Sequence, residues 1–543
     1  WRSKAKVIFR CTPQWFVPMD KPMDRQVPLC ANEAEIRAAQ GAGETLRQTA
    51  LQAIADTRFV PDKGRHRIGA MVEGRPDWVL SRQRAWGVPI TLFVNRKTGQ
   101  YLNDAAVNAR IVAAIREGGV DAWSDARAQE YLGTDYAAAD YERVVDILDV
   151  WFDSGSTHAF VLESGKWPDL LRPEGWTGPR ADLYLEGSDQ HRGWFQSSLL
   201  ESCATRGHAP YKAVLTHGFT MDAKGEKMSK SKGNTVSPIK VMETNGADII
   251  RLWALSVDYT EDHRIGDEIL KGVADQYRKL RNTFRYLLGA LDGYTEAEGD
   301  VPVAEMPELE RYVLALLARL DATLRQATAD FDFNTYVRAL SDFCNEDLSA
   351  FFFDIRKDSL YCDAPSDPRR RAYRRVLDVL FHALVRYAAP VLVFTAEEVW
   401  QSRYPGSDSV HLLEWPDLSG FAADEALLVK WQAVRAVRNE VLAAIEPLRR
   451  EKQIGSSLAA AVDLIVAEPL WAAAIEGLDL SEIFIAGEVQ SAAGRVEGAP
   501  IKVTVRPTLD DKCGRCWRHL PEVEEDGALC SRCDQVVAGM DAA

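Results

Sequence analysis

The sequence predicts an α/β region built on a parallel sheet, then a long α-helical region, then a small cysteine-bearing tail. Residues 146 to about 260 alternate strand-like runs (DLYLEG, KAVLTHGF) with helical ones (RGWFQSSLLESCATRG, DIIRLWALSV). That alternation is typical of parallel strands joined by crossover helices. From about 267 to 452 apolar residues recur at helical spacing. Four of the nine cysteines fall in the last 31 residues.

The remaining segments are shorter and mixed. Residues 1–145 combine strand-like runs (VIFRC, ITLFV) with polar connections and a helical stretch at 104–117. Within the run YRRVLDVLFHALVRYAAPVLVF, Pro390 should kink or end a helix. Residues 453–505 read as a small α+β segment and 506–543 as the tail. The predicted domain limits are therefore 1–75, 76–145, 146–266, 267–452, 453–505 and 506–543.

Composition excludes few functions. A chain of 543 residues with 46% hydrophobic and 27% charged residues is typical of a globular protein with several domains. No run of eighteen apolar residues occurs, so we expect no membrane partner. Cysteines scattered outside the tail fit reduced thiols in the cytoplasm. The net charge of -15 does not exclude a nucleic-acid partner, because phosphate binding depends on local Lys/Arg patches.

Polar residues follow two of the predicted strands. Glu186, Gly187, Asp189 and Gln190 come directly after DLYL, and His217-Gly218-Phe219 ends the next strand. Ligands of open α/β sheets bind beyond the carboxyl ends of the strands. Carboxylates there suit a ligand ammonium or ribose hydroxyls. Taken singly, each residue is more often a helix cap or a loop polar group.

The segment MDAKGEKMSKSKGNTVSP, residues 221–238, is a basic loop. Lys227 and Lys230 are compact charges on flexible stems, suited to binding a polyphosphate. Ser229 adds a neutral donor, and Gly225 and Gly233 would let the loop move. By composition alone, a solvated loop without function is an equally good interpretation.

The tail contains two CxxC pairs, with thirteen residues between Cys516 and Cys530. This spacing predicts a tetrahedral site in which four thiolates hold one structural zinc ion. Disulfides and an iron–sulfur cluster are the alternatives. The predicted ligands are Cys513, Cys516, Cys530 and Cys533; His519 would be redundant.

The motifs resemble those of the class I aminoacyl-tRNA synthetase family. KMSKS at 227–231 follows HGF at 217–219, and both follow GSDQHRGWF at 187–195. The stretches DVWFDSGSTH at 149–158 and SRQRAWGVPI at 81–90 are similar to those of the isoleucine enzymes; a valine or leucine enzyme is the alternative. The resemblance runs from Trp1 through Cys533.

This resemblance implies a fold and a reaction. It implies the second half of a Rossmann-type catalytic domain at 146–266, preceded by the end of an editing insertion (1–75) and a connective segment (76–145). A helical anticodon-binding domain at 267–452 and a zinc tail implicated in tRNA binding would follow. The implied activity is ATP-dependent formation of isoleucyl-adenylate and transfer of isoleucine to tRNA(Ile), with Mg²⁺ accompanying ATP, in a monomeric cytoplasmic enzyme.

The resemblance also implies residue roles. Glu186, Gly187, Asp189 and Gln190 would line the isoleucyl-adenylate pocket, and His217 and Phe219 would lie by the adenine. Lys230 would bind an ATP phosphate with Lys227 assisting, and Ser229 would line the same site.

One departure limits the expected activity. The family's first ATP motif, His-x-Gly-His, occurs nowhere in this sequence, and the chain opens on Trp1 without an initiator Met. We therefore expect an incomplete chain that alone neither forms adenylate nor edits. A tRNA-binding module without synthetic activity is the second hypothesis.

Basic residues cluster in and after one helical run. Arg435, Arg438, Arg449, Arg450 and Lys452 are, as a group, reasonable phosphate contacts, although a solvated helix face explains any one of them. Phe351, Phe352 and Phe353 are predicted to belong to the core.

Overall fold

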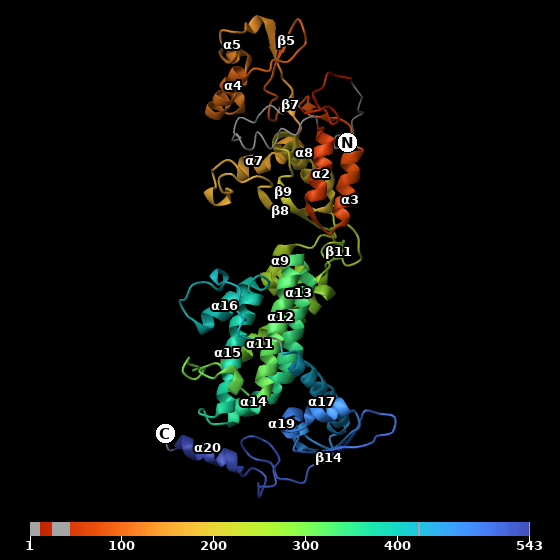
Figure 1. Ribbon diagram of the computed structural model, residues 1–543, viewed down its shortest axis with the longest axis vertical. Helices are drawn as coiled ribbons and strands as arrows, with labels where there is room; N and C mark the ends of the chain where they lie inside the picture. Colours follow the sequence, from red (N-terminus) through yellow and green to blue (C-terminus); the bar gives the residue numbers. More distant parts are fainter. Residues whose placement is uncertain (1–10, 24–43, 422–423, 542–543) are drawn as a thin grey trace. The chain divides into compact units, whose positions relative to one another are not determined.

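The computed structural model describes residues 11–23, 44–421 and 424–541 (Figure 1). The chain forms two compact units, one of residues 1–219 with 260–262 and one of residues 220–259 with 263–543. Of the predicted strand VIFRC, only Cys11 belongs to the described residues, and it lies outside any strand.

The first unit is organised around a three-stranded parallel sheet. Its strands are β2 (Arg58–Val60), β9 (Tyr211–His217) and β8 (Ala181–Gly187), in the order β2-β9-β8. The central strand β9 is buried on both faces from Ala213 to Thr216, as expected for a parallel strand covered by helices. Helix α8 (Trp194–Arg206) connects β8 to β9, and the predicted parallel sheet with a crossover helix is confirmed.

Helices α2 (Leu46–Asp56) and α3 (Lys63–Glu73) lie with α8 beside this sheet (Figure 1), and α6 (Val150–Gly155) packs against α8. Phe195 and Leu199, four residues apart on one face of α8, are fully buried, as their spacing predicted. Their burial fixes the end of β8 relative to the start of α8.

The rest of the first unit consists of short elements. Antiparallel pairs join β1 to β3, β4 to β7 and β5 to β6. The expected helix at 104–117 is confirmed as α4, whose first turn is capped by the Asp104 carboxylate accepting from the Val107 N–H. The elements are β1 (Phe16–Val17), β3 (Trp78–Val79), β4 (Ser81–Arg82), β5 (Phe93–Asn95), α4 (Ala105–Gly118), α5 (Ala128–Leu132), β6 (Tyr141–Arg143), β7 (Ile147–Leu148) and α7 (Thr157–Leu162).

The second unit is mainly helical. Helix α15 ends at Ala388 and α16 begins at Val393, so Pro390 ends the helix as predicted. The predicted core residues Phe351, Phe352 and Phe353 are buried. The helices are α9 (Pro238–Asn245), α10 (Ala247–Ser256), α11 (Asp267–Ala290), α12 (Glu308–Asp330), α13 (Phe333–Asp342), the π-helix η7 (Phe343–Phe352), α14 (Phe353–Cys362), α15 (Pro368–Ala388), α16 (Val393–Arg403) and α17 (Glu425–Arg450).

The end of the second unit has the expected α+β character. Strand β12 (Ala460–Val466) pairs in parallel with β13 (Glu488–Ala493) and antiparallel with β14 (Ile501–Pro507). Helices α18 (Pro469–Ile475) and α19 (Leu480–Phe484) lie between the strands in sequence, and α20 (Ser531–Asp541) ends the tail. Among the described residues, no helix is long and apolar enough to cross a membrane.

Candidate functional sites

The carboxyl ends of β8 and β9 bring the first group of predicted residues together. Gly187 pairs with His217 across the two strands, and Glu186 pairs with Thr216. Gly187 is buried, and a Cβ there would lie 2.6 Å from Asp189 Oδ1, so only glycine lets the Asp189 carboxylate fold back over the strand end. Glu186 is exposed beside it. The two carboxylates therefore sit at one edge of the sheet, where a cationic or hydroxyl-bearing ligand could bind.

Gln190 orders the turn between β8 and α8. Its Oε1 accepts the Trp194 N–H at 3.0 Å and caps the first turn of α8, while its Nε2 donates to Asp189 Oδ2 at 3.1 Å. Trp194 stacks on Tyr184 of β8 with ring centroids 4.1 Å apart. Gln190 thus positions the Asp189 carboxylate as well as being a candidate ligand itself.

The His217–Phe219 segment packs against residues 260–262, which belong to the same unit. A Cβ on Gly218 would lie 2.3 Å from the Glu261 carbonyl, so only glycine fits against that backbone. The Phe219 N–H donates to Asp262 Oδ1 at 2.7 Å, and the Phe219 ring is partly exposed. His217 Nδ1 lies 2.8 Å from the Gly218 carbonyl oxygen, which fixes the ring as a donor at Nδ1.

Two further residues lie beside this group. His191 follows the same strand and is buried, with Nδ1 on the Ser188 carbonyl oxygen at 2.7 Å and Nε2 without a hydrogen-bond partner. Trp151, for which the sequence predicts no role, lies close to Gly193, where a Cβ would meet its ring at 2.9 Å. Its indole is substantially exposed next to Gln190 and offers an apolar surface. Its place within the DVWFDSG motif was the only sequence signal for it, and its exposure is visible in the structure alone.

The basic loop in the second unit has a hydrogen-bonded frame. Asn234 Nδ2 donates to Asp222 Oδ2 at 2.8 Å, and Asn234 Oδ1 accepts the Ser229 N–H at 2.9 Å. Asp222 also accepts the N–H groups of Lys224 and Glu226. The hydrogen bond from Asn234 and these backbone N–H groups lower the pKa of the Asp222 carboxyl.

The lysines of this loop are not equivalent. Lys227 and Lys230 are exposed, and Ser229 shares a 3.2 Å hydrogen bond with Ser231. Another lysine of the loop, Lys232, pairs instead with Glu226 at 3.4 Å. Lys230 is therefore a candidate anion ligand, whereas the charge of Lys232 is partly compensated within the loop.

The predicted site residues fall into two sets. Glu186, Gly187, Asp189, Gln190, His217 and Phe219 belong to the first unit, and Lys227, Ser229 and Lys230 belong to the second. Within the first unit, the structure assembles its set at the ends of two adjacent strands. The ligand roles of both sets stay predictions.

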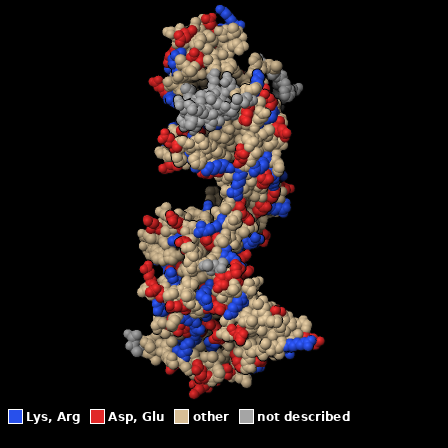
Figure 2. Space-filling view, viewed as in Figure 1, with Lys and Arg blue, Asp and Glu red and all other residues tan. Residues whose placement is uncertain are grey.

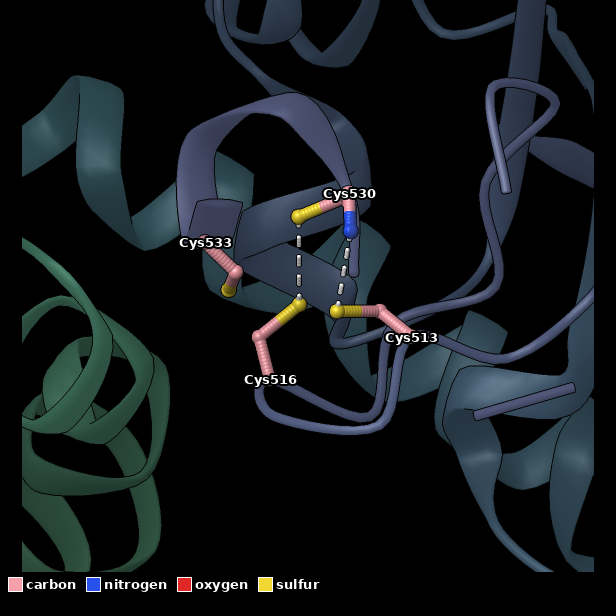
Figure 3. A group of neighbouring side chains, drawn as sticks. All are labelled: Cys513, Cys516, Cys530 and Cys533. Atoms are coloured by element: carbon pink, nitrogen blue, oxygen red, sulfur yellow. Dashed lines mark hydrogen bonds between the residues drawn. The ribbon is translucent and has the colours of Figure 1, made fainter. Parts of the chain in front are cut away.

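The four cysteines of the tail converge (Figure 3). The Sγ atoms of Cys513, Cys516, Cys530 and Cys533 all lie within 4.8 Å of one another and are buried. Cys530 donates its N–H to Cys513 Sγ at 3.3 Å, which favours the thiolate form. His519 is held elsewhere, with Nδ1 on the Asp510 carbonyl oxygen at 2.7 Å.

This geometry fits zinc. A tetrahedral ion with Zn–S bonds of about 2.3 Å places its sulfurs about 3.8 Å apart. The Sγ atoms of Cys516 and Cys530 are 3.9 Å apart. All four positions of a tetrahedron are filled by protein ligands, so the site is structural and offers no open coordination position.

Two of the five predicted phosphate-contacting residues pair with carboxylates of the helical unit. Arg438 is buried, so the prediction was wrong for it, whereas Arg435 is only partly buried and its phosphate contact stays a prediction. Arg435 is ion-paired with Asp347 of η7, and Arg438 donates to the Ile483 carbonyl oxygen at 2.9 Å and to Asp354 at 3.3 Å. Both guanidinium groups also lie over the Phe351 ring. They fasten α17 to η7 and α14. Arg449, Arg450 and Lys452 are exposed.

A buried carboxyl lies beneath the DVWFDSG motif. Glu201 of α8 is buried, and a Cβ on Gly155 of α6 would lie 2.0 Å from its Oε1, so glycine is required for this close packing of the two helices. Burial raises the pKa of Glu201 to about 9, with Asp153 adding to the rise and Arg206 opposing it. The carboxyl is therefore protonated at neutral pH.

Three families match successive parts of this chain. Residues 2–266 match tRNA synthetases class I (I, L, M and V), residues 310–464 match the anticodon-binding domain of tRNA ligase, and residues 510–536 match the zinc finger found in FPG and IleRS. The parallel sheet lies within the first of these ranges, helices α13 to α17 within the second and the four-cysteine site within the third. The fold and these matches together define a class I aminoacyl-tRNA synthetase.

The curated relatives that match nearly the whole chain are isoleucine–tRNA ligases. The chain is 58% identical over 99% of its length to an isoleucine–tRNA ligase of Zymomonas mobilis, covering 55% of that protein. It is 50% identical over 97% of its length to one of Caulobacter vibrioides and 49% identical over 99% to one of Gluconobacter oxydans, covering 52% and 53% of them. The chain belongs to the isoleucine–tRNA ligase family. It spans about half the length of the curated relatives it matches, as their C-terminal portion.

Proposed function

We propose that this chain takes part in activating isoleucine with ATP and in transferring it to tRNA(Ile). An isoleucine carboxylate oxygen attacks the α-phosphorus of ATP, the bond to the bridging oxygen breaks, and pyrophosphate leaves. A ribose hydroxyl at the tRNA terminus then attacks the carbonyl of isoleucyl-adenylate, and AMP leaves. The observation that carries this proposal is the loop that presents Lys227 and Lys230 on the Asp222–Asn234 frame.

In this proposal the first unit binds isoleucyl-adenylate. The exposed Glu186 carboxylate suits the ammonium group, and Asp189, oriented by Gln190, suits ribose hydroxyls. The exposed Trp151 indole next to Gln190 supplies an apolar wall for an aliphatic side chain. The partly exposed Phe219 ring and the His217 imidazole suit an adenine.

The basic loop would act on the phosphates. The reaction needs no covalent nucleophile, because positioning and neutralisation of developing phosphate charge accelerate such transfers. Lys230 supplies the principal ammonium group, Lys227 assists it, and Ser229 donates a hydrogen bond. Mg²⁺ would accompany ATP and share the neutralisation.

The helical unit and the zinc tail would bind tRNA. Figure 2 shows Lys and Arg side chains interspersed with Asp and Glu over the visible face of the second unit. Local basic positions therefore exist despite the net charge of -15. The exposed residues Arg449 and Arg450, at the end of α17, and Lys452, just after it, remain the proposed phosphate contacts. The cytoplasmic location and the monomeric state stay predictions.

Amino-acid-dependent ATP–pyrophosphate exchange tests the activation step. The protein to assay is this chain joined to the N-terminal portion of a relative that the chain does not cover. Exchange that depends on isoleucine, with valine weaker and leucine inactive, supports the proposal. One extra methylene in an apolar pocket contributes about 10–200-fold discrimination, a range for which the isoleucine enzyme is the standard example. Exchange that prefers valine or leucine would overturn it.

A second function is favoured for residues 1–543 expressed alone. The helical unit and the four-cysteine tail are compact within these residues, whereas the sequence contains no His-x-Gly-His. The isolated chain is therefore expected to bind tRNA(Ile) without catalysing exchange. Isoleucine-dependent exchange by the isolated chain would contradict this expectation.

A further inference from the structure

The two zinc knuckles share one feature besides their cysteines. Each has an arginine directly before its second cysteine: Arg515 in Cys513-Gly-Arg-Cys516 and Arg532 in Cys530-Ser-Arg-Cys533. The backbone of each arginine is thus fixed between two ligands of the same metal site. Both side chains extend to one place in the helical unit, the last turn of α14.

Arg515 caps that helix. Its Nη1 donates to the Cys362 carbonyl oxygen at 2.6 Å and its Nη2 donates to the Tyr361 carbonyl oxygen at 3.1 Å. The last carbonyl groups of an α-helix have no partner within the helix and carry partial negative charge. A guanidinium group satisfies both at once.

Arg532 pairs with the carboxylates of the same turn. Its Nη1 lies 2.7 Å from Asp358 Oδ2 and 3.0 Å from Asp363 Oδ1, and its Nη2 donates to Asp358 Oδ1 at 3.0 Å. Asp358 is in α14 and Asp363 is its C-terminal cap. This two-oxygen pairing with Asp358 is the directional geometry that arginine forms and lysine cannot reproduce.

The docking point is tied to the centre of the helical unit. Asp363 also accepts from Arg369 at 3.0 Å, and Arg369 pairs with Glu482 of α19 at 3.3 Å. Glu482 pairs with Arg356 at 2.8 Å, and Arg356 is held by two bonds to the fully buried Glu310 of α12. The tail therefore docks on a turn that is itself held by buried ion pairs.

A fifth thiol lies beneath the tail. Cys362, the last residue of α14, is only 6% exposed and packs in one cluster with the four zinc-site cysteines. It is not one of the four converging ligands. Its exposure is thus a direct measure of whether the tail is docked.

We propose that Arg515 and Arg532 form a zinc-dependent clamp that docks the tail on the C-terminal turn of α14. The metal fixes the two knuckles, the knuckles aim the two guanidinium groups, and these hold the tail over Cys362. The clamp therefore positions the exposed Trp517, which lies next to Cys516, relative to the helical unit. The effect of the clamp on tRNA binding rests on the proposed function. The docking of the tail on α14 is independent of that function.

Labelling of Cys362 with N-ethylmaleimide, read by mass spectrometry on the zinc-loaded chain, tests the clamp. Arg532→Gln is expected to speed Cys362 labelling at least about tenfold, because removing a partly buried ion pair favours local opening. Zinc content should stay at one per chain. Arg532→Lys, which keeps the charge but not the two-bond geometry, should give an intermediate rate. Cys11, which is exposed, and Cys344, which is buried, are internal references.

Two further variants keep the test decisive. Asp358→Asn breaks the clamp from α14, away from the ligands, and should expose Cys362 as Arg532→Gln does. Arg518→Gln removes one charge from the same tail without touching the clamp and should leave Cys362 protected. Cys362 labelling at the wild-type rate in both Arg532→Gln and Asp358→Asn would overturn the clamp, as would exposure by Arg518→Gln to the same extent.

A separate readout addresses the tRNA. In the joined protein used for exchange, Arg532→Gln should raise KM for tRNA(Ile) while isoleucine-dependent exchange stays unchanged. An unchanged KM with exposed Cys362 would uphold the docking clamp and overturn its consequence for tRNA. Absence of exchange in the parent protein would count against the proposed function alone.

Discussion

Asn234 donates a 2.8 Å hydrogen bond to Asp222 across the base of the loop that carries Lys227 and Lys230. The same Asn234 side chain accepts the Ser229 N–H, so one amide joins both ends of the loop. Ser229 lies between the two lysines in sequence. The hydrogen bonds of Asn234 to Asp222 and Ser229 therefore limit where the two ammonium groups can reach.

Removing the Asn234 hydrogen bonds at the base of the loop should weaken ATP binding without abolishing ATP–pyrophosphate exchange. Asn234→Ala deletes the side-chain bonds to Asp222, to Ser229 and, at 3.3 Å, to the Lys227 carbonyl oxygen. The loop should then sample more conformations, because each bond contributes on the order of 1 kcal/mol. In exchange assays on the joined protein, we expect KM for ATP to rise several-fold and KM for isoleucine to stay unchanged. Asn234→Asp keeps the acceptor for Ser229 but sets a second carboxylate against Asp222, so it should raise KM for ATP at least as much as Asn234→Ala does. Equal changes in both KM values would count against the frame.

Zinc should be lost when one ligand is removed. Cys530→Ser takes away a thiolate and also breaks the close contact with Cys516, so the zinc content should drop from one per chain to near zero. Cys344→Ser is the matched control, since Cys344 is equally buried but lies in the helical unit. Elemental analysis after dialysis checks this result. Retention of zinc by the Cys530 variant would show that the four cysteines do not form the site.

The buried carboxyl of Glu201 should make stability depend on pH. Its pKa is about 9 in the folded chain and near 4.5 in the unfolded chain, so the folded state binds more protons between these values. Stability from this group therefore falls as pH rises from about 5 toward 9. Glu201→Gln, neutral in both states, should lose that dependence.

Urea unfolding at pH 5.5 and pH 8 measures this effect. Relative to the parent chain, Glu201→Gln should be stabilised at pH 8 by at least about 1 kcal/mol more than at pH 5.5. Glu163→Gln is a useful comparison, because Glu163 is ion-paired with Arg206 and should show no such gain. The same difference at both pH values would show that Glu201 is charged in the folded chain.

Much of the fold could be predicted because its signals are local. The β8-α8-β9 arrangement follows from the change between strand-like and helical runs, and the break between α15 and α16 follows from Pro390. The four-cysteine cluster follows from spacing alone, since two CxxC pairs close together can converge on one metal. Each of these features is encoded within a few residues.

The errors concern partners that are distant in sequence. Arg438 was predicted as a phosphate contact from its charge, but it is buried on Asp354, which lies 84 residues earlier. The partner of Arg435, Asp347, is as distant at 88 residues. Composition shows a positive charge and cannot show which carboxylate it meets. The docking of Arg532 on α14 was invisible for the same reason, because Asp358 is 174 residues away.

Some side chains have a second role that a motif does not reveal. Gln190 was predicted as a ligand, and the structure shows that it also caps α8 and orients Asp189. A motif shows only which residues occur. Whether the Gln190 side chain caps the helix or faces a ligand depends on the backbone conformation of η5 (Ser188–Arg192).

Replacing one lysine of the basic loop at a time tests the proposed role of this loop in ATP use most directly. In the joined protein, Lys230→Ala should lower isoleucine-dependent ATP–pyrophosphate exchange at least about 10²-fold, the typical loss when one preorganised donor to developing charge is removed. Lys232→Ala is the matched control, because Lys232 pairs with Glu226, and exchange should stay within about threefold since exposed pairs contribute little. Equal losses in the two variants, or full exchange by Lys230→Ala, would contradict the proposed role of this loop.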